Sequence, residues 1–215
     1  MTISGTAVPL NRSGAALWRA VCLISLSVFL GLGVTVYATG VLPGDVFISQ
    51  QLIANDTGVV TELARWVNYG GRAQVLVPAA ILLFWLSPVA RRDWWLWCVA
   101  LIGAPLLQNV LKFVVGRSRP SGSSLGFPSG DVTAATAFAM VVIYVVSRED
   151  LGRGLRWALA ALAVCLMLAV GWARIMRHAH WPSDVLGGFL LGAACTAAAA
   201  WWESSRSEIG APRTS

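Results

Sequence analysis

Cationic side chains and histidines with the potential for chemistry gather in two short segments of this sequence. The 215 residues include one lysine, Lys112, and two histidines, His178 and His180. Lys112 is followed after six residues by Arg119, and Arg174 is followed after five residues by His180. Arginine offers phosphate oxygens a planar fork of N–H donors, and lysine offers them a point charge. Brought together by folding, these residues would form an anion-binding site.

A turn between the two segments adds backbone donors to this chemistry. Pro128, Ser129, Gly130 and Asp131 lead directly into an apolar run. The first turn of a helix has unpaired N–H groups and the positive end of the helix dipole, and both favour phosphate. Capping of the helix by Ser129 or Asp131 is the simpler structural role, and it is compatible with phosphate binding.

A histidine and an aspartate supply a candidate nucleophile. Asp184 follows His180 by four residues, and the intervening Trp-Pro-Ser marks a helix start. A carboxylate that accepts a hydrogen bond from one ring nitrogen fixes the tautomer and leaves the other nitrogen free to attack. We therefore expect His180 to act with Asp184.

The composition indicates that a membrane protein positions these residues. Hydrophobic residues make up 57% of the chain and charged residues 12%, with a mean hydropathy of +0.68. Soluble domains carry about 25% charged residues. The net charge of +6 comes from arginines scattered between apolar runs, a pattern that favours membrane topology over nucleic-acid binding.

The apolar runs predict an all-α fold, a polytopic bundle of six transmembrane helices in a single domain over residues 1–215. The first run is longer than the apolar stretch of a cleaved signal peptide, so we interpret it as a retained span. The tail 203–215 is polar, and we expect it to be flexible. The expected spans are 15–38, 73–90, 94–115, 132–146, 155–175 and 185–202.

Two further patterns concern helix packing. Within the polar stretch 40–72, Val59, Val60, Leu63 and Val67 recur at helical spacing, which predicts an amphipathic surface helix. In the last span, Gly188 and Gly192 form a G-x-x-x-G pattern that predicts close packing against another helix.

The distribution of basic residues orients the predicted bundle. With both termini in the cytoplasm, inner segments hold nine basic residues and outer segments seven. Counting spans puts both motif-bearing segments on the outer face. The excess of basic residues on the inner side becomes clear if five of the outer ones are retained there for a function. These five are Lys112, Arg117, Arg119, Arg174 and Arg177.

The three blocks resemble the signature of the type 2 phosphatidic acid phosphatase superfamily. That signature reads K-x(6)-R-P, then P-S-G-H, then S-R-x(5)-H-x(3)-D. The matching residues span about a third of the chain, and Ala173 stands where the family often has serine. They are Lys112, Arg119, Pro120, Pro128, Ser129, Gly130, Arg174, His180 and Asp184.

The resemblance implies a metal-independent lipid phosphatase of the plasma (inner) membrane with its active site on the outer face. His180 would form a phosphohistidine, oriented by Asp184, with no cofactor. The substrate would be a membrane lipid: an isoprenyl phosphate or diphosphate, phosphatidate or phosphatidylglycerophosphate. Five residues would bind phosphate: Lys112, Arg119, Ser129, Gly130 and Arg174. Secondary candidates are Arg117 and Arg177 for phosphate or headgroup contact, and His178 as a replacement proton donor.

One position departs from the signature. Asp131 stands where the family has the histidine thought to protonate the leaving oxygen. Three hypotheses account for it: Asp131 is protonated and serves as the acid, the substrate is a diphosphate whose leaving group needs little acid help, or the protein binds phosphate and turns over poorly. Two alternative functions stay open, a lipid phosphotransferase that uses the same residues and a catalytically impaired lipid-phosphate-binding homologue.

Overall fold

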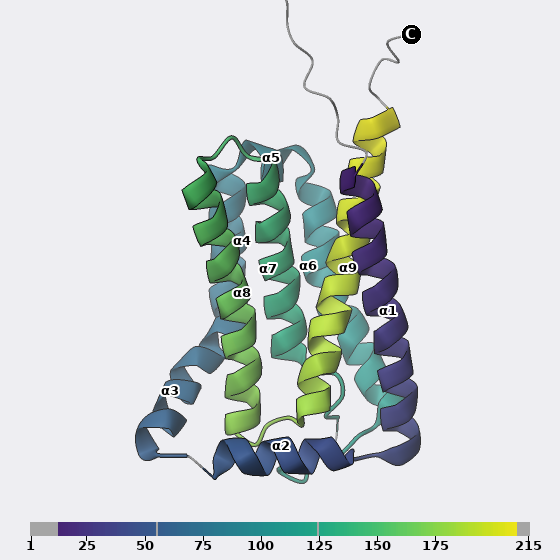
Figure 1. Cartoon of the computed structure of the whole chain (residues 1–215), viewed down its shortest axis with the longest axis vertical. Coiled ribbons are helices and arrows are strands. Elements are labelled where there is room, and N and C mark those ends of the chain that lie inside the picture. Colours follow the sequence, from purple (N-terminus) through teal and green to yellow (C-terminus); the bar gives the residue numbers. More distant parts are fainter. Residues whose placement is uncertain (1–12, 55, 124, 210–215) are drawn as a thin grey trace, which may run out of the picture.

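The computed structural model of the chain describes residues 13–54, 56–123 and 125–209, and every regular element among them is a helix. Figure 1 shows long helices side by side, with one short helix lying across their lower end. The prediction of an all-α membrane bundle is confirmed. The elements are α1 Ser13–Thr39, α2 Pro43–Ile53, α3 Gly58–Asn68, the 3-10 turn η1 Tyr69–Gly71, α4 Ala73–Leu86, α5 Pro88–Arg92, α6 Trp94–Val115, α7 Gly130–Arg148, α8 Arg153–Met176 and α9 Pro182–Ile209.

Five of these helices, α1, α6, α7, α8 and α9, are long and apolar enough to cross a membrane. The second predicted span, 73–90, is different. The helix α4 has 14 residues, or about 21 Å at 1.5 Å per residue, and a bilayer core is about 30 Å thick. It reaches spanning length only together with α3 and η1, from which it is bent by 49°. A sixth crossing would therefore consist of two helices joined by a bend. The helix α4 ends at Leu86 because Ser87 and Pro88 begin α5.

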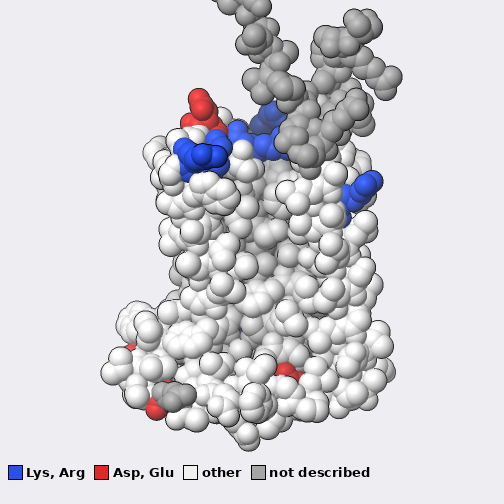
Figure 2. Space-filling model, in the orientation of Figure 1, with Lys and Arg blue, Asp and Glu red and all other residues white. Residues whose placement is uncertain are grey.

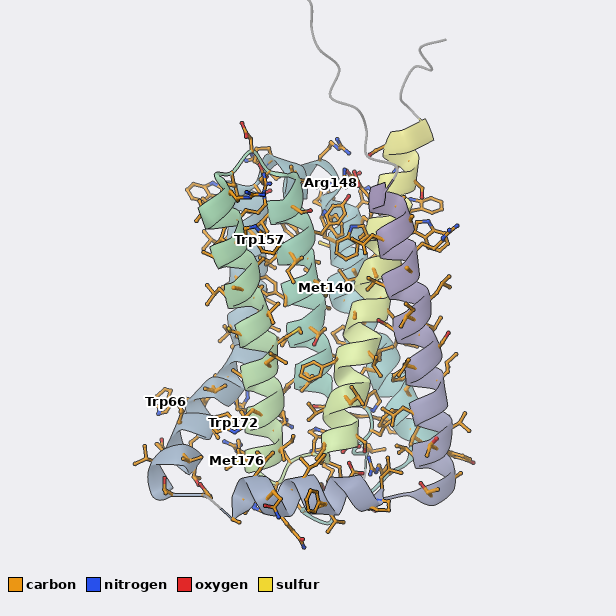
Figure 3. All side chains as sticks on the ribbon, in the orientation of Figure 1. Trp66, Met140, Arg148, Trp157, Trp172 and Met176 are labelled. Carbon is orange, nitrogen blue, oxygen red and sulfur yellow. The ribbon has the colours of Figure 1, made fainter. Side chains whose placement is uncertain are left out.

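The predicted amphipathic surface helix is confirmed as α3. Its side chains Val59 and Leu63 are 79% and 54% exposed, whereas Ala64 on the opposite face is fully buried. Trp66 points away from the bundle (Figure 3). This helix therefore presents one apolar face outward and packs the opposite face on the bundle, as an amphipathic surface helix does.

The expectation of a flexible tail from residue 203 is wrong for the residues described. The last helix, α9, continues to Ile209. Glu203 is buried, accepts hydrogen bonds from Arg92 at 2.7 Å and from Tyr144, and so anchors the end of α9 to the bundle. Residues 210–215 lie outside the described residues.

The helices α7 and α9 pack closely because two glycines of α9 leave room for the α7 backbone. A Cβ on Gly188 would lie 2.8 Å from the Ser129 carbonyl oxygen, and one on Gly192 would lie 2.6 Å from that of Thr133. This confirms the packing predicted from the G-x-x-x-G pattern. It brings the beginnings of the two helices together, and the Ser129 amide donates to the Asp184 carbonyl oxygen at 3.0 Å.

Candidate active site

The predicted histidine–aspartate pair is formed at the lower end of the bundle in Figure 1, between the end of α8 and the first turn of α9. Nδ1 of His180 lies 3.4 Å from Oδ2 of Asp184. The same carboxylate accepts from the Trp181 amide at 3.0 Å and, through Oδ1, from Arg117 at 2.6 Å. Asp184 is fully buried and His180 is 1% exposed. The bonds from Trp181 and Arg117 therefore hold the Asp184 carboxylate in place independently of its contact with the imidazole.

The other ring nitrogen of His180, Nε2, is buried and has no hydrogen-bond partner. Burial lowers the pKa of His180 to about 4, aided by the charges of Arg174 and Lys112 and opposed by Asp184. At neutral pH the imidazole is therefore uncharged. A proton on Nδ1, facing Asp184, leaves the lone pair on Nε2 available as a nucleophile.

The turn before α7 is held by a residue that carries no motif signal. Gln108 on α6 is buried and donates from Nε2 to the Pro128 carbonyl oxygen at 3.2 Å. A Cβ on Gly130 would lie 2.8 Å from Oε1 of Gln108, so a larger residue there would displace this amide from its position. The hydroxyl of Ser129 is buried without a partner. A buried donor left unpaired at a helix start is suited to binding an anion.

The cationic side chains of the first and third blocks lie in the same site. Lys112 is half-buried at the end of α6, and its ammonium interacts electrostatically with Arg119, Arg174 and Asp131. Arg119 donates from Nε and from a terminal nitrogen to the Leu125 carbonyl oxygen, both at 3.3 Å. The structure thus brings the three sequence blocks together.

Asp131 forms an ion pair with Arg174, at 2.8 Å between Oδ2 and a terminal nitrogen. The same nitrogen donates to Oδ1 of Asn68 at 2.8 Å, while Nε of Arg174 is buried and unpaired. One terminal nitrogen of Arg174 therefore contacts both Asp131 and Asn68, and Nε of Arg174 stays available as a donor to an anion. In this arrangement Asp131 acts as an anion whose charge Arg174 offsets.

An apolar cavity of about 500 Å³ opens beside the cations, between α4, α6 and α7. Its polar end contains Lys112, Gln108 and Asp131, and the remainder is lined by apolar side chains. Val77 and Ile81 on α4 belong to this lining and are 54% and 64% exposed, so the cavity opens on the surface that faces the lipid.

Comparison with known proteins agrees with this geometry. A model of the PAP2 superfamily matches residues 121–208. A lipid A 1-phosphatase of Rhizobium etli is 31% identical over 165 residues, which cover 62% of this chain and 67% of the relative. The chain belongs to the PAP2 superfamily. Phosphatidylglycerophosphatase B of Bacillus subtilis is 26% identical over 173 residues, covering 76% of this chain and 85% of that protein.

The fold of this PAP2 protein is also that of a solved relative. The crystal structure of a transmembrane PAP2 type phosphatidylglycerolphosphate phosphatase from Bacillus subtilis has a TM-score of 0.73 at 22% identity, covering 90% of this chain and 98% of the other. Members of the superfamily are phosphoric ester hydrolases. The predictions of an integral membrane protein and of a hydrolase of this class are therefore confirmed.

The three secondary candidates differ in their surroundings within this PAP2 protein. Arg117 is buried, and its terminal nitrogens contact Asp45 and Asp184, so its charge is used inside the protein. Arg177 and His178 are exposed at the end of α8. Arg117 is thus already paired with two carboxylates. Phosphate or headgroup contact by Arg177 and proton donation by His178 stay predictions.

Sequence reasoning missed two residues that complete the PAP2 site from the segment 40–72. Asp45 on α2 contacts Arg117, and Asn68 at the end of α3 contacts Arg174. Both are buried polar residues in a stretch without motifs. In the sequence, Asp45 and Asn68 are single polar residues near apolar ones, and neither stands at a spacing that would indicate a function. Among the described residues, no group of three or more histidine, cysteine or acidic side chains is arranged to hold a metal ion.

Proposed function

We propose that this PAP2 protein is a metal-independent lipid phosphatase that removes phosphate from an amphiphilic lipid phosphate or diphosphate through a phosphohistidine on His180. The observation that carries the proposal is the buried, uncharged imidazole whose Nε2 has no protein partner. Asp184 supports its other nitrogen, and Lys112 and Arg174 lie close enough to act on its charge.

The reaction follows from these positions in two steps. Nε2 of His180 attacks phosphorus in line, the N–P bond forms, and the bond from phosphorus to the leaving oxygen breaks. Water then attacks the phosphohistidine, and inorganic phosphate leaves. Asp184 stabilises the imidazole while it carries positive charge. Lys112, Arg119, Arg174 and the donors at Ser129 and Gly130 offset the charge on the phosphoryl oxygens, and removing one such donor costs about 2.7–4 kcal/mol of barrier.

The ion pair of Asp131 supports a substrate with a good leaving group. A general acid must bring a proton to the leaving oxygen, whereas Asp131 lies against the Arg174 guanidinium as an anion. A phosphate leaving group, as in a diphosphate, needs little protonation. We therefore infer a lipid diphosphate as the preferred substrate, with its hydrocarbon tail in the cavity between α4, α6 and α7.

The outer membrane face is our proposed location of the site. The end of the bundle opposite the site exposes several arginines, and Figure 2 shows basic side chains gathered at that upper end. Basic residues at one end favour placing that end in the cytoplasm. The exposed members are Arg91, Arg92, Arg148, Arg153 and Arg206.

The test is a phosphate-release screen of the purified protein in detergent micelles with excess EDTA. Farnesyl diphosphate, farnesyl phosphate, dioleoyl phosphatidate and phosphatidylglycerophosphate are compared, with His180→Ala as the blank and His178→Ala as the matched histidine variant. We expect release that EDTA leaves intact, His180→Ala abolishes and His178→Ala retains. Activity that is lost in EDTA and restored by zinc or magnesium would contradict the mechanism. Transfer of the phosphoryl group to an added lipid alcohol instead of water would make the protein a phosphotransferase.

A further inference from the structure

A buried ionic network connects the short helix α2 to the nucleophile. Asp45, 2% exposed, contacts a terminal nitrogen of Arg117. The other terminal nitrogen of Arg117 donates to Oδ1 of Asp184 at 2.6 Å, and Oδ2 of Asp184 faces His180. The network thus runs from the Asp45 carboxylate through the Arg117 guanidinium and the Asp184 carboxylate to the His180 imidazole. It joins residues that lie far apart in the sequence.

Asp45 also fixes the beginning of α9 from outside that helix. Its Oδ1 accepts from the Ser183 amide at 2.8 Å, and its Oδ2 accepts from the Ser183 hydroxyl at 2.8 Å. The Ser183 hydroxyl in turn accepts from Arg117 at 2.6 Å. Satisfying a free N–H in the first turn of a helix is what a capping side chain does. Here the cap comes from α2 and holds the residue next to Asp184.

The charges of this network decide how strongly Asp184 acts on His180. Arg117 alone would neutralise Asp184, because the two form a buried ion pair. Asp45 is the second carboxylate on the same guanidinium, so the group of three retains one net negative charge. An anionic Asp184 favours the positive charge that the imidazole acquires in the phosphohistidine, and a neutralised pair would favour it less.

We propose that Asp45 is a positioning residue that acts through Arg117 and Ser183, sets the orientation and net charge of Asp184, and thereby controls the reactivity of His180. This inference rests on the proposed role of His180 as nucleophile. It assigns a catalytic contribution to α2, a helix outside the three blocks of the superfamily signature.

The test is a charge-balance cycle measured as kcat and KM on farnesyl diphosphate and dioleoyl phosphatidate in micelles. Asp45→Asn removes the outer negative charge, Arg117→Gln removes the positive charge, and the double variant returns the network to one net negative charge. We expect Asp45→Asn to lower kcat because Arg117 then neutralises Asp184. We expect Arg117→Gln to lower kcat because two buried carboxylates lose the guanidinium that orients them. Each loss should be about tenfold to a hundredfold with little change in KM. We expect the double variant to be more active than either single variant, which a purely structural role would not produce.

Two controls keep failure of this inference distinct from failure of the proposed function. His180→Ala tests the nucleophile: if it is as active as the wild type, the proposed function is wrong. Asp56→Asn is the matched charge change, since Asp56 is an exposed aspartate whose carboxylate accepts from the Thr61 hydroxyl at 2.6 Å, and we expect it to retain wild-type activity. With His180→Ala inactive, an Asp45→Asn protein with wild-type kcat, or a double variant whose loss is the product of the single losses, would overturn the role of Asp45.

A second readout covers variants that fold poorly. The groups that act on the charge of His180 are Asp184 on α9, Arg174 on α8 and Lys112 on α6. Losing a negative charge in the network disfavours the protonated imidazole, so the acid limb of kcat/KM moves to lower pH in Asp45→Asn. Asp45→Glu retains the charge and should retain the wild-type limb. Thermal melts and gel filtration of each variant report folding, and identical acid limbs in all of them would also overturn the proposal.

Discussion

At the scale of single residues, the ion pair of Asp131 with Arg174 changes the interpretation of this departure from the signature. In the sequence Asp131 is an anion at a position where a phosphatase of this superfamily has a proton donor. In the structure it lies 2.8 Å from Arg174, so its charge is offset within the site and it also occupies one arginine nitrogen. In the proposed site, the departure from the signature would therefore alter the charge balance around the anion as well as the protonation of a leaving group.

Replacing Asp131 separates these two effects. Asp131→Asn should strengthen competitive inhibition by inorganic phosphate by about tenfold, because a like charge beside the anion is removed. Asp131→His should raise the rate on farnesyl phosphate by about a hundredfold relative to Asp131→Asn, because an imidazole can protonate an alcohol leaving group. Inhibition constants and kcat for both substrates measure this, with the exposed Asp150→Asn as control. An Asn variant that lost diphosphate hydrolysis and kept its phosphate inhibition constant would instead identify Asp131 as the acid.

The buried state of His180 predicts an unusual pH dependence. Histidine with an ordinary pKa of about 6.5 is protonated below that pH, whereas the pKa of His180 is lowered to about 4. Its lone pair is therefore available between these values, and kcat/KM should stay high until the pH approaches 4. Unfolding restores the ordinary pKa, so the unfolded chain binds more protons in this window and stability should rise with pH from about 4 to about 6.5. An acid limb near pH 6.5, or a melting temperature that responds to pH identically in wild type and His180→Gln, would contradict the buried, uncharged state.

Most of the candidate site residues could be predicted from their types and spacing. They belong to three short sequence blocks, and residues close together in a block stay close together in the fold. Lys112, Arg174, His180 and Asp184 share one end of the bundle as expected. The supporting residues Asp45, Asn68 and Gln108 could not be found this way. Each is a single buried polar side chain whose partner is more than fifteen residues away in sequence, and only folding makes the pair.

At the scale of elements, apolar run length predicted the long helices and missed the shorter ones. The bounds of α6 agree with the predicted span, and α7 and α9 extend beyond theirs. The helix α9 is continued by Glu203, which accepts a hydrogen bond from the buried Tyr144. The helix α2 lacks a helical apolar period. Its start is stabilised by Asp45, whose Oδ2 accepts from the Leu42 amide at 3.1 Å, and by contacts with α8 and α9. Such tertiary contacts have no local signature.

The turn η1 has no space for a side chain, and this can be tested. A Cβ on Gly71 would lie 2.7 Å from Val170 and 2.9 Å from Cβ of Asp131. Gly71→Ala should therefore displace η1 from α7 and α8, lower the free energy of unfolding by about 1–3 kcal/mol and reduce activity. Thermal unfolding in detergent measures the loss. Gly103→Ala in α6 is the matched control, because its Cβ would meet no atom within 4 Å; equal melting temperatures for the two variants would refute the steric argument.

At the scale of the whole molecule, the two ends use their positive charges differently. At the end with α5, arginines are exposed to the surroundings (Figure 2). At the end with α2, Lys112, Arg117 and Arg174 are partly or fully buried and surround the site. A simple count of basic residues per side therefore gives a weak orientation signal, because it mixes exposed arginines at one end with buried cations of the proposed site at the other.

Thiol labelling tests the orientation that follows. In a background with all four cysteines replaced by alanine, Ser121→Cys lies at the site end and Asp150→Cys at the opposite end, both at exposed positions. A membrane-impermeant maleimide should label Ser121→Cys in right-side-out vesicles and should label Asp150→Cys only after lysis. The reverse pattern would place the site on the cytoplasmic side.

The cavity between α4, α6 and α7 has a consequence for how the rate of this enzyme is set. Its apolar lining includes residues exposed on the lipid-facing surface, so the proposed tailed substrate would reach Lys112 by lateral diffusion within one leaflet. The encounter then occurs in two dimensions, and the quantity that governs turnover is the mole fraction of substrate among its neighbouring lipids. Adding inert lipid at a constant bulk concentration of substrate lowers the mole fraction of substrate in the membrane and should slow the reaction. The same holds for any enzyme that takes its substrate from the bilayer.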